Sequence, residues 1–381
     1  MKIHPSFLIY RDDRFYSSFP AVAACSANDI HVVFRRCPSY YGYPGIDPDT
    51  FRCHHDVTSQ LMYTRSGDAG KSWSEPETLF APYNGGSQDG GLYFDGKYLF
   101  ANSFIWEHIP HFMENNLKEY GFDRHLAAFG KNTSAALPGG VYLLRSDDRG
   151  KSWQGPYQPD PLPDGTEYFP GHPRLMHNRG NLVRGNDGAL YWVGERFEHS
   201  PELYADIMLY RSEDNGRSFQ YFATAADSLG RDIYEEPFMC ITPAGKYVIL
   251  IRSQRCLPDG SLSRADLVTV ESVDGGKTWS DPVRHDIHAE PSAAQRLPDG
   301  RTMIVYGYRK EPFGIRGRIV SPEFEDLDTT EEFIIRDDSP EIDTGYPWLT
   351  MLDNKRLLVV YYIKTGAVRC AGGIEGNIIE L

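Results

Sequence analysis

The sequence predicts an all-β fold, a six-bladed β-propeller that forms one domain over residues 1–381. Three observations lead to this prediction. A short turn motif occurs four times, and the stretches between its copies contain strand-like runs joined by hairpin turns. The composition also fits, because 36 Gly, 26 Pro and an aromatic content of 13% are typical of many short strands connected by tight turns.

The repeated turn has the form Ser-x-Asp-x-Gly-(Lys/Arg)-(Ser/Thr)-aromatic. In such a turn the Ser and Asp side chains can bond the turn's own amides, the Gly supplies a positive φ, and the aromatic ring anchors the turn. A fifth copy is expected near residues 321–325, where the motif has decayed. The four intact copies are Ser66–Trp73, Ser146–Trp153, Ser212–Phe219 and Ser272–Trp279.

Inner hairpins alternate with these turns along the whole chain. Dipeptides such as Asp-Gly, Ala-Gly and Asn-Lys at their tips are typical of two-residue hairpin loops. Units of about four short strands, roughly 50 to 80 residues apart, fit a propeller better than a sandwich or a barrel. The hairpins are predicted near residues 19–34, 91–99, 181–192, 240–249, 295–305 and 350–359.

One segment, residues 104–138, departs from this pattern. Within it, Met113 to Ala128 mixes Leu, Phe and charged residues at helical spacing. We therefore expect an insertion in the second unit that carries a short helix over one face.

The formal net charge of −14 argues against a nucleic-acid partner, because phosphate binding requires a basic surface. A local arginine cluster can still bind a small anion. The histidines lack metal-ligand spacing, so we predict neither a metal nor another cofactor. The start at Met1 has no signal-peptide core and no segment could span a membrane, which favours a cytoplasmic protein. A secreted protein trimmed to its mature form is the alternative.

The repeated turn resembles the Asp-box of the sialidase superfamily, whose members are six-bladed β-propellers. The resemblance covers essentially the whole chain. It implies the fold more strongly than the activity, because Asp-boxes lie outside the active site and occur in unrelated activities.

The same resemblance implies a set of site residues. Glu236 and Arg252, sixteen residues apart, look like the family's pair in which Glu assists the nucleophile and Arg binds the substrate carboxylate. Tyr346 stands where the family has its nucleophilic tyrosine. Arg309 is the candidate for a further substrate-binding arginine, with Arg316 as the reserve.

Such a set is chemically reasonable. A carboxylate nucleophile would be repelled by a substrate that carries a carboxylate beside its reacting carbon, whereas a tyrosine is neutral until a Glu takes its proton. Arginines hold a carboxylate through two parallel hydrogen bonds. A carboxylic acid on the opposite side would protonate the leaving oxygen.

The sequence departs from the family pattern at two places. Ser18 stands where the family usually has its first arginine, and losing that contact would cost about 1.5 to 3 kcal/mol of recognition. Arg35 or Arg36, at the other end of the hairpin, could replace the charge. For the acid, the best match is Asp56, with His55 as an alternative proton donor.

Other polar residues open the inner strands and indicate an axial pocket suited to a sugar. Asp89 and Arg179 are the candidates for substrate binding among them, and the segments His177–Gly180 and His288–Pro291 contribute further polar groups.

The favoured function is therefore an exo-acting glycoside hydrolase of the sialidase type that removes a terminal sugar from a glycan. An acidic sugar is expected, and because Ser18 replaces the family arginine, a different acidic sugar or a neutral one stays open. Three alternatives stay open. An arabinan-cleaving propeller would use Glu195 and Glu236 as paired carboxylates. A uronate lyase would use Arg252 with Tyr346 or His177, and a non-catalytic propeller would only bind glycans.

Overall fold

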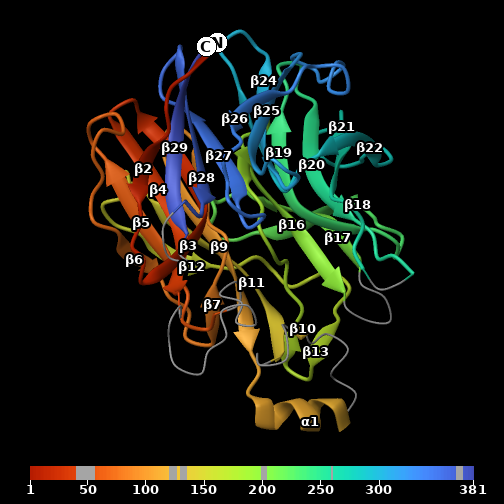
Figure 1. The fold of residues 1–381 in the computed structure, drawn as a ribbon. Helices are drawn as coiled ribbons and strands as arrows, with labels where there is room; N and C mark the ends of the chain where they lie inside the picture. Colours follow the sequence, from red (N-terminus) through yellow and green to blue (C-terminus); the bar gives the residue numbers. More distant parts are fainter. Residues whose placement is uncertain (40–55, 120–126, 129–134, 199–203, 259–260, 366–371) are drawn as a thin grey trace.

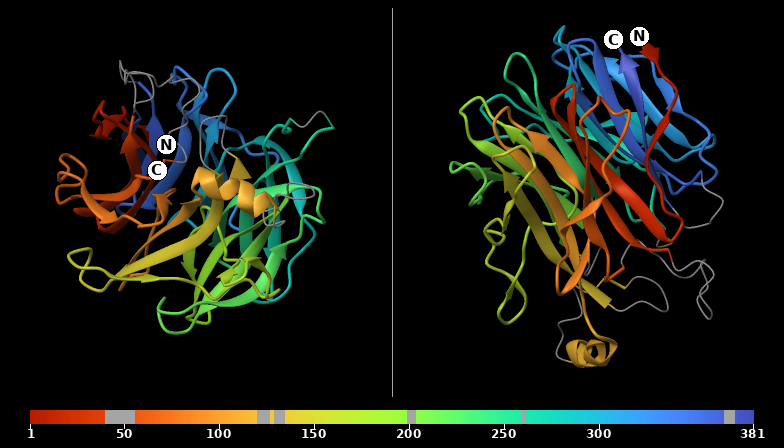
Figure 2. Two further views of the ribbon diagram at one scale, coloured as in Figure 1. Left: turned by 90° about the horizontal axis from the view of Figure 1, so that it is seen from below. Right: turned by 90° about the vertical axis from the view of Figure 1, so that its left-hand side faces the viewer.

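The computed structural model describes the chain except for residues 40–55, 120–126, 129–134, 199–203, 259–260 and 366–371. The described part consists of 29 strands and one α-helix. Antiparallel sheets are arranged side by side around a central axis, which gives a propeller-like, all-β molecule (Figures 1 and 2). That the whole chain is a single domain stays a prediction.

The first sheet follows the expected order of strand, turn, strand, strand and repeated turn. Neighbouring strands pair antiparallel throughout, and the repeated turn joins the last two. The strands are β3 (Phe15–Ser26), β4 (Asp29–Pro38), β5 (Gln60–Ser66) and β6 (Glu77–Phe80).

The second sheet carries the insertion. Its two long strands continue past the body of the sheet, and the helix stands apart from the propeller at their end (Figure 1). The elements are β7 (Gly85–Ser87), β8 (Gly91–Phe94), β9 (Leu99–His108), α1 (His111–Glu119), β10 (Ala127–Ala128), β11 (Ala135–Ser146) and β12 (Gln154–Tyr157).

The insertion thus differs from the expected segment 104–138 in its boundaries. Residues at both of its ends belong to β9 and β11, where Ala136 pairs with His108. The helix also begins earlier and is shorter than the helical spacing from Met113 to Ala128 indicated. This helix, the one in the described residues, is neither long nor apolar enough to cross a membrane.

The third sheet contains eight strands. In the described part of the chain, one parallel strand pairing, Ala205 with Ile233, joins two antiparallel groups of four strands. The first group is β15 (Leu182–Arg184), β16 (Leu190–Glu198), β17 (Tyr204–Ser212) and β18 (Gln220–Ala226), and the second is β19 (Ile233–Ile241), β20 (Tyr247–Gln254), β21 (Asp266–Ser272) and β22 (Val283–His288). A separate strand pair, β13 (Glu167–Phe169) and β14 (His172–Pro173), precedes them.

Two further sheets complete the ring, and the last of them uses both ends of the chain. The N-terminal strands β1 and β2 pair with the C-terminal strand β29. The first sheet of the two is β23 (Ser292–Arg296), β24 (Thr302–Tyr308), β25 (Gly314–Val320) and β26 (Phe333–Arg336), and the last is β27 (Gly345–Met351), β28 (Arg356–Ile363), β29 (Gly373–Glu380), β1 (Lys2–Ile3) and β2 (Phe7–Tyr10).

One strand from each antiparallel group lies next to the axis, and together we term these the inner strands. Each contacts the next, and the last contacts the first, so that they form a closed ring. They are β3, β8, β15, β19, β23 and β27. Because they all run in the same sense along the axis, the residues that precede or begin them meet at one end of it.

The repeated turns form the hydrogen bonds that the motif predicts. In the copy at residues 272–279, the Ser272 hydroxyl accepts from the Gly276 amide at 2.9 Å and donates to the Asp274 carboxylate at 2.8 Å. The amide and hydroxyl of Thr278 donate to the same carboxylate. The decayed turn keeps one part of this pattern, since the Glu325 amide donates to the Ser321 hydroxyl.

Replacing Ser272 with alanine should lower the free energy of unfolding by about 1 to 2 kcal/mol, because the buried amide of Gly276 loses its acceptor. Urea denaturation measures the loss. Val273→Ala is the matched control, since the Val273 side chain lies exposed in the same turn. Equal losses in the two variants would show that the hydroxyl does not hold the turn.

Candidate functional site

The inner strands β3, β19 and β27 share an irregular step at the axial end. In each, a residue with positive φ is followed by proline, and the strand register shifts across the pair. The residues with positive φ are Phe19 at 54°, Glu236 at 51° and Tyr346 at 50°. Non-glycine residues rarely adopt this conformation, and such strain is concentrated at functional sites. Because of this step, the polar side chains of Glu236 and Tyr346 point toward each other.

Tyr346 and Glu236 are hydrogen-bonded, as the resemblance implied. The Tyr346 hydroxyl donates to Glu236 Oε1, and Arg252 Nη1 donates to Glu236 Oε2 at 3.0 Å. The same Arg252 nitrogen lies 3.5 Å from the phenolic oxygen. Burial and the neighbouring Glu236 carboxylate raise the pKa of Tyr346 well above its usual value, against the opposing effect of Arg252. The phenol is therefore neutral and has a carboxylate positioned to accept its proton.

The Tyr346 ring is fixed by its neighbours. The guanidinium carbons of Arg179 and Arg309 lie 5.1 Å and 5.4 Å from the ring centroid, within the range of cation–π contact. The Phe19 ring packs at a centroid distance of 4.5 Å. These contacts restrict the ring so that its hydroxyl stays on Glu236.

Arg252 and Arg309 converge on a carboxylate of the protein itself. Glu290 Oε2 lies 3.5 Å from Arg252 Nη2 and accepts from Arg309 Nη1 at 3.3 Å, and Glu290 Oε1 lies 3.1 Å from His288 Nε2. Burial alone would raise the pKa of Glu290, but the His288 hydrogen bond and the two arginines outweigh it and lower the pKa to about 2. Glu290 is therefore ionised, and we term it with Arg252 and Arg309 the arginine clamp.

Asp89 and Arg179 also reach the axis. Burial, followed by the charge of Glu236, raises the pKa of Asp89 to about 7, although Arg179, Arg35 and Arg252 act in the opposite direction. Arg35 pairs across the hairpin with Ser18 in the strand register and is fully buried. The register therefore places Arg35, rather than Arg36, opposite the position where the family arginine was expected.

Two further carboxyl groups, the half-buried Glu235 and the buried Glu195, lie near Glu236. Burial raises the pKa of Glu235 to about 7, helped by Glu236 and opposed mainly by Arg252, whose Nε lies 3.6 Å from it. Burial and the charge of Glu235 raise the pKa of Glu195 well above its usual value. A carboxyl group that stays protonated near neutral pH can act as a general acid.

Asp56 and Arg316, which the sequence analysis placed in the site, contact other groups of the protein. The Asp56 carboxylate accepts from the amide of Thr58 at 2.7 Å and from its hydroxyl at 2.5 Å, and no contact among the described residues joins it to Tyr346. Arg316 donates to the carbonyls of Arg336 and Pro312 and stacks on the Tyr308 ring. His55 lies outside the described residues. The acid role of Asp56 or His55 and the substrate-binding role of Arg316 stay predictions.

Sequence reasoning noted Glu290 and Glu235 but assigned neither of them a role. A signal for Glu290 was present, because Glu290-Pro291 repeats the residue-proline step of Glu236-Pro237 and Tyr346-Pro347. Each of these dipeptides marks the axial end of an inner strand.

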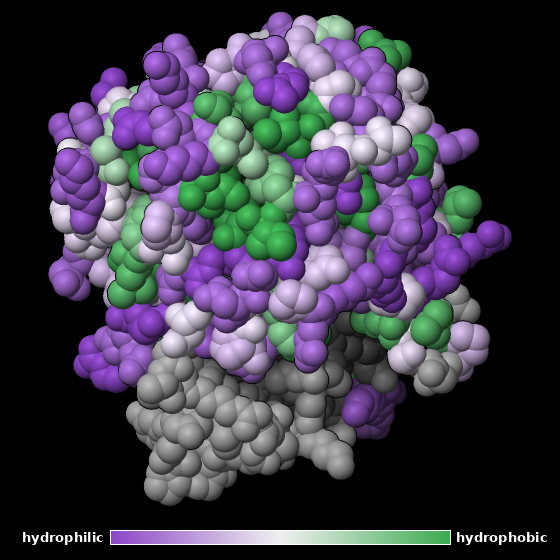
Figure 3. Space-filling view, turned by 45° about the horizontal axis from the view of Figure 1, so that its top comes forward, coloured by the Kyte–Doolittle hydropathy of each residue, from purple (hydrophilic) through white to green (hydrophobic). Residues whose placement is uncertain are grey.

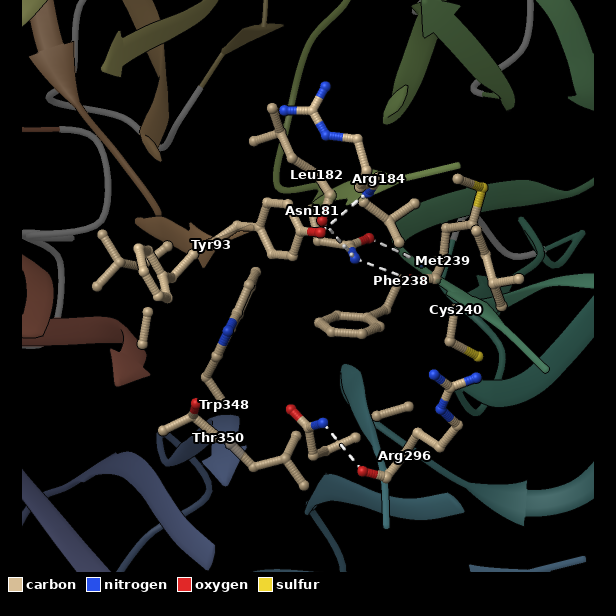
Figure 4. A pocket seen from close by; sticks show the side chains of 18 of the residues that line it. Tyr93, Asn181, Leu182, Arg184, Phe238, Met239, Cys240, Arg296, Trp348 and Thr350 are labelled. Carbon is tan, nitrogen blue, oxygen red and sulfur yellow. Dashed lines mark hydrogen bonds between the residues drawn. The ribbon is translucent and has the colours of Figure 1, made fainter. Parts of the chain in front are cut away.

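A cavity of about 360 Å³ opens at the other end of the axis (Figure 4). The Phe238 and Trp348 rings line it, and Asn181 is engaged there by the backbone of Met239 at 2.7 and 2.8 Å. Hydrophobic side chains form a patch surrounded by hydrophilic ones on the face seen in Figure 3. The ionisable groups around Tyr346 do not line this cavity, so it is separate from the candidate site.

Cys25, Asp29 and His31 form a further group of side chains that could hold a metal ion, with ligand atoms within 4.8 Å of one another. They belong to the hairpin of β3 and β4, at the end of β3 far from Ser18. Any role of this group would be independent of Tyr346.

The raised pKa values of Asp89 and Glu235 predict that stability falls as the pH rises. A carboxyl group whose pKa is higher in the folded than in the unfolded state binds its proton more tightly when folded, so stability is greatest below about pH 4 and is lost up to about pH 7. Glu290 acts oppositely, and its contribution is lost only as the pH falls toward about 2.

Asp89→Asn should therefore reduce the loss of unfolding free energy between about pH 5 and pH 8. Urea denaturation at both pH values tests this, with the exposed Asp281→Asn as the control. An unchanged pH dependence in Asp89→Asn would show that Asp89 does not titrate in this range.

The model of the BNR repeat-like domain family matches residues 128–359, which is more than half of the chain. Among solved structures, the chain is similar to a protein of unknown function from Dyadobacter fermentans, with 31% identity and a TM-score of 0.87 over 100% of this chain and 99% of that one. No curated protein matches the chain.

Two more distant structures share the fold. The NanB sialidase from Streptococcus pneumoniae is 13% identical, with a TM-score of 0.60 over 99% of this chain and 71% of that one. The α-L-arabinanase from Penicillium chrysogenum is 15% identical, with a TM-score of 0.62 over 100% of this chain and 99% of that one. With the matched family model, the repeated turns and the ring of inner strands, the chain belongs to the BNR-repeat β-propeller superfamily, which includes the sialidases.

Proposed function

We propose that the protein is an exo-acting glycoside hydrolase that removes a terminal sugar from a glycan with retention of configuration. One observation carries the proposal. The Tyr346 hydroxyl donates to Glu236, and Arg252 holds the other oxygen of that carboxylate at 3.0 Å. A nucleophile bonded to a base, which is oriented by a third group, is the arrangement that covalent catalysis requires.

In the proposed reaction, the Tyr346 oxygen attacks the anomeric carbon while its proton passes to Glu236. The bond to the leaving oxygen breaks, and a carboxylic acid donates a proton to that oxygen. Water then attacks the anomeric carbon of the tyrosyl-sugar and loses a proton to the carboxylate that acted as the acid. The bond between that carbon and the Tyr346 oxygen breaks, and the oxygen takes its proton back from Glu236. Arg252 stabilises the phenolate character that develops during attack, because its Nη1 lies 3.5 Å from the phenolic oxygen.

Asp89 is the carboxyl group that best fits the acid in this proposal. Its pKa of about 7 leaves it protonated in part near neutral pH, and it is close enough to Glu236 for the two charges to interact. The sequence favoured Asp56 for this role, and the Asp56 carboxylate is engaged with Thr58 instead.

We further propose that the propeller has six blades. The eight-stranded sheet then counts as two blades, because among the described residues the strand pairing between its halves is limited to Ala205 with Ile233. Each blade contributes one inner strand, so the axial site draws residues from different blades.

A second candidate function is a hydrolase in which two carboxyl groups perform the chemistry. Glu195 favours it, because burial and the adjacent Glu235 raise its pKa and suit it as the acid opposite Glu236. The similarity in fold to an arabinanase agrees with this candidate. A uronate lyase using Tyr346 or His177 would form an unsaturated product, and a glycan-binding propeller without activity would form none.

Tyr346→Phe and Glu236→Gln should each lower turnover of aryl glycosides at least ~100-fold, because the first removes the nucleophile and the second its base. The test is a panel that includes a sialoside and an α-L-arabinofuranoside, with the configuration of the first product followed by NMR. Tyr361→Phe is the matched control, since this buried tyrosine of the same sheet bonds Asn377 at 2.5 Å.

The outcomes separate the candidates. Full activity in Tyr346→Phe together with loss in Glu195→Gln would favour the paired carboxylates. A product that absorbs as an unsaturated uronate would mean a lyase, and no turnover of any substrate by the unmodified protein would contradict the hydrolase.

A further inference from the structure

Each carboxylate oxygen of Glu290 is already engaged in the arginine clamp. Oε2 is shared between Arg252 at 3.5 Å and Arg309 at 3.3 Å, while Oε1 lies 3.1 Å from His288. Glu290 is 8% exposed, so the group is held inside the protein and is not a loose surface partner. Arg252 and Arg309 are half-buried, and the place between them that could receive an anion is therefore occupied by an anion of the chain.

The other nitrogens of the two arginines also have partners within the protein. Arg252 contacts Glu236 at 3.0 Å and Glu235 at 3.6 Å in addition to Glu290. Arg309 directs its remaining nitrogens at oxygens of Thr344 and Tyr362, each at 3.3 Å. A substrate carboxylate would have to displace Glu290 and leave it buried without its charge partners, which costs several kcal/mol.

The family's first arginine is missing from β3, and the arginines near its position contact other groups of the protein. Ser18 takes its position in β3, and the buried Arg35 paired with Ser18 acts on Asp89. Arg179 donates to the Pro347 carbonyl at 3.1 Å and stacks on the Trp348 ring. Each of these cations thus has a partner within the protein.

From the arginine clamp we infer that the site takes a sugar without a carboxylate on its reacting carbon, with Glu290 occupying the position of that group. The inference rests on the proposed function and narrows the terminal sugar that it removes to one without a carboxylate on the reacting carbon. Tyr346 remains a suitable nucleophile, because Glu235, Glu236 and Glu290 already face this end of the axis and a phenol adds no charge.

The test compares binding of N-acetylneuraminic acid with binding of its methyl ester by calorimetry. The ester lacks the negative charge of the carboxylate and carries one additional methyl group. The unmodified protein should bind the acid no more tightly than the ester. Glu290→Ala frees both arginines and the space between them, and should bind the acid at least ~10-fold more tightly than the ester.

Two further variants make the test specific. Glu290→Gln keeps the volume of the side chain and removes its charge, so it should gain less affinity for the acid than Glu290→Ala. Glu332→Ala is the matched control, because Glu332 pairs with two arginines of β25, Arg316 at 3.7 Å and Arg318 at 3.9 Å. It should leave the ratio of the two affinities unchanged. Circular dichroism confirms that each variant is folded.

A preference of the unmodified protein for the acid by ~10-fold or more would overturn the inference, as would a folded Glu290→Ala variant without that preference. The readout is binding, so it is independent of turnover. Failure of the proposed hydrolase appears as an absence of turnover, whereas failure of the inference appears as a preference for the charged probe.

Discussion

The contacts of Arg252 with three carboxyl groups hold the axial site together. Glu235 and Glu236 come from β19 and Glu290 directly precedes β23, so one guanidinium on β20 links neighbouring parts of the ring. Without this cation, several buried carboxyl groups would repel one another, and removing one partner from such a cluster leaves uncompensated charge behind. The positive charge stabilises the carboxylates unequally, because the pKa of Glu235 is raised whereas that of Glu290 is lowered. Near neutral pH the cluster therefore combines Glu235, which is protonated in part, with Glu290, which is ionised.

The backbone makes this cluster possible. Glu236 and Tyr346 each adopt a positive φ before a proline, in strands that otherwise pair regularly. Such a conformation costs of the order of 1 to 3 kcal/mol and persists only where the surroundings enforce it. Here the enforcement comes from the closed ring, because each inner strand is packed between two others. Strain at two places on the ring brings a phenol and a carboxylate into hydrogen-bond contact although 110 residues separate them in the chain.

The repeated turns made the fold predictable, because their hydrogen bonds are local and each copy encodes them within eight residues. The pairing of Tyr346 with Glu236 and Arg252 was predictable only through a family resemblance. The role of Glu290 was not, because it depends on two arginines that long-range packing brings together. The N-terminal strands were missed for a similar reason, since Phe7–Tyr10 lacks a hairpin partner nearby and pairs with residues near the C-terminus. Asp56 was chosen from its distance to a turn, which does not determine where its carboxylate points.

The last sheet joins the two ends of the chain, and this has a consequence for biosynthesis. The strand β29 pairs with β1 and β2 on one side and with β28 on the other. During translation, β1 and β2 are synthesised long before β29, so they have no strand to pair with until then. The last sheet is therefore complete only after β29 has been synthesised. A nascent chain that stalls before β29 would leave the edges of β28, β1 and β2 unpaired, and such edges are prone to aggregation.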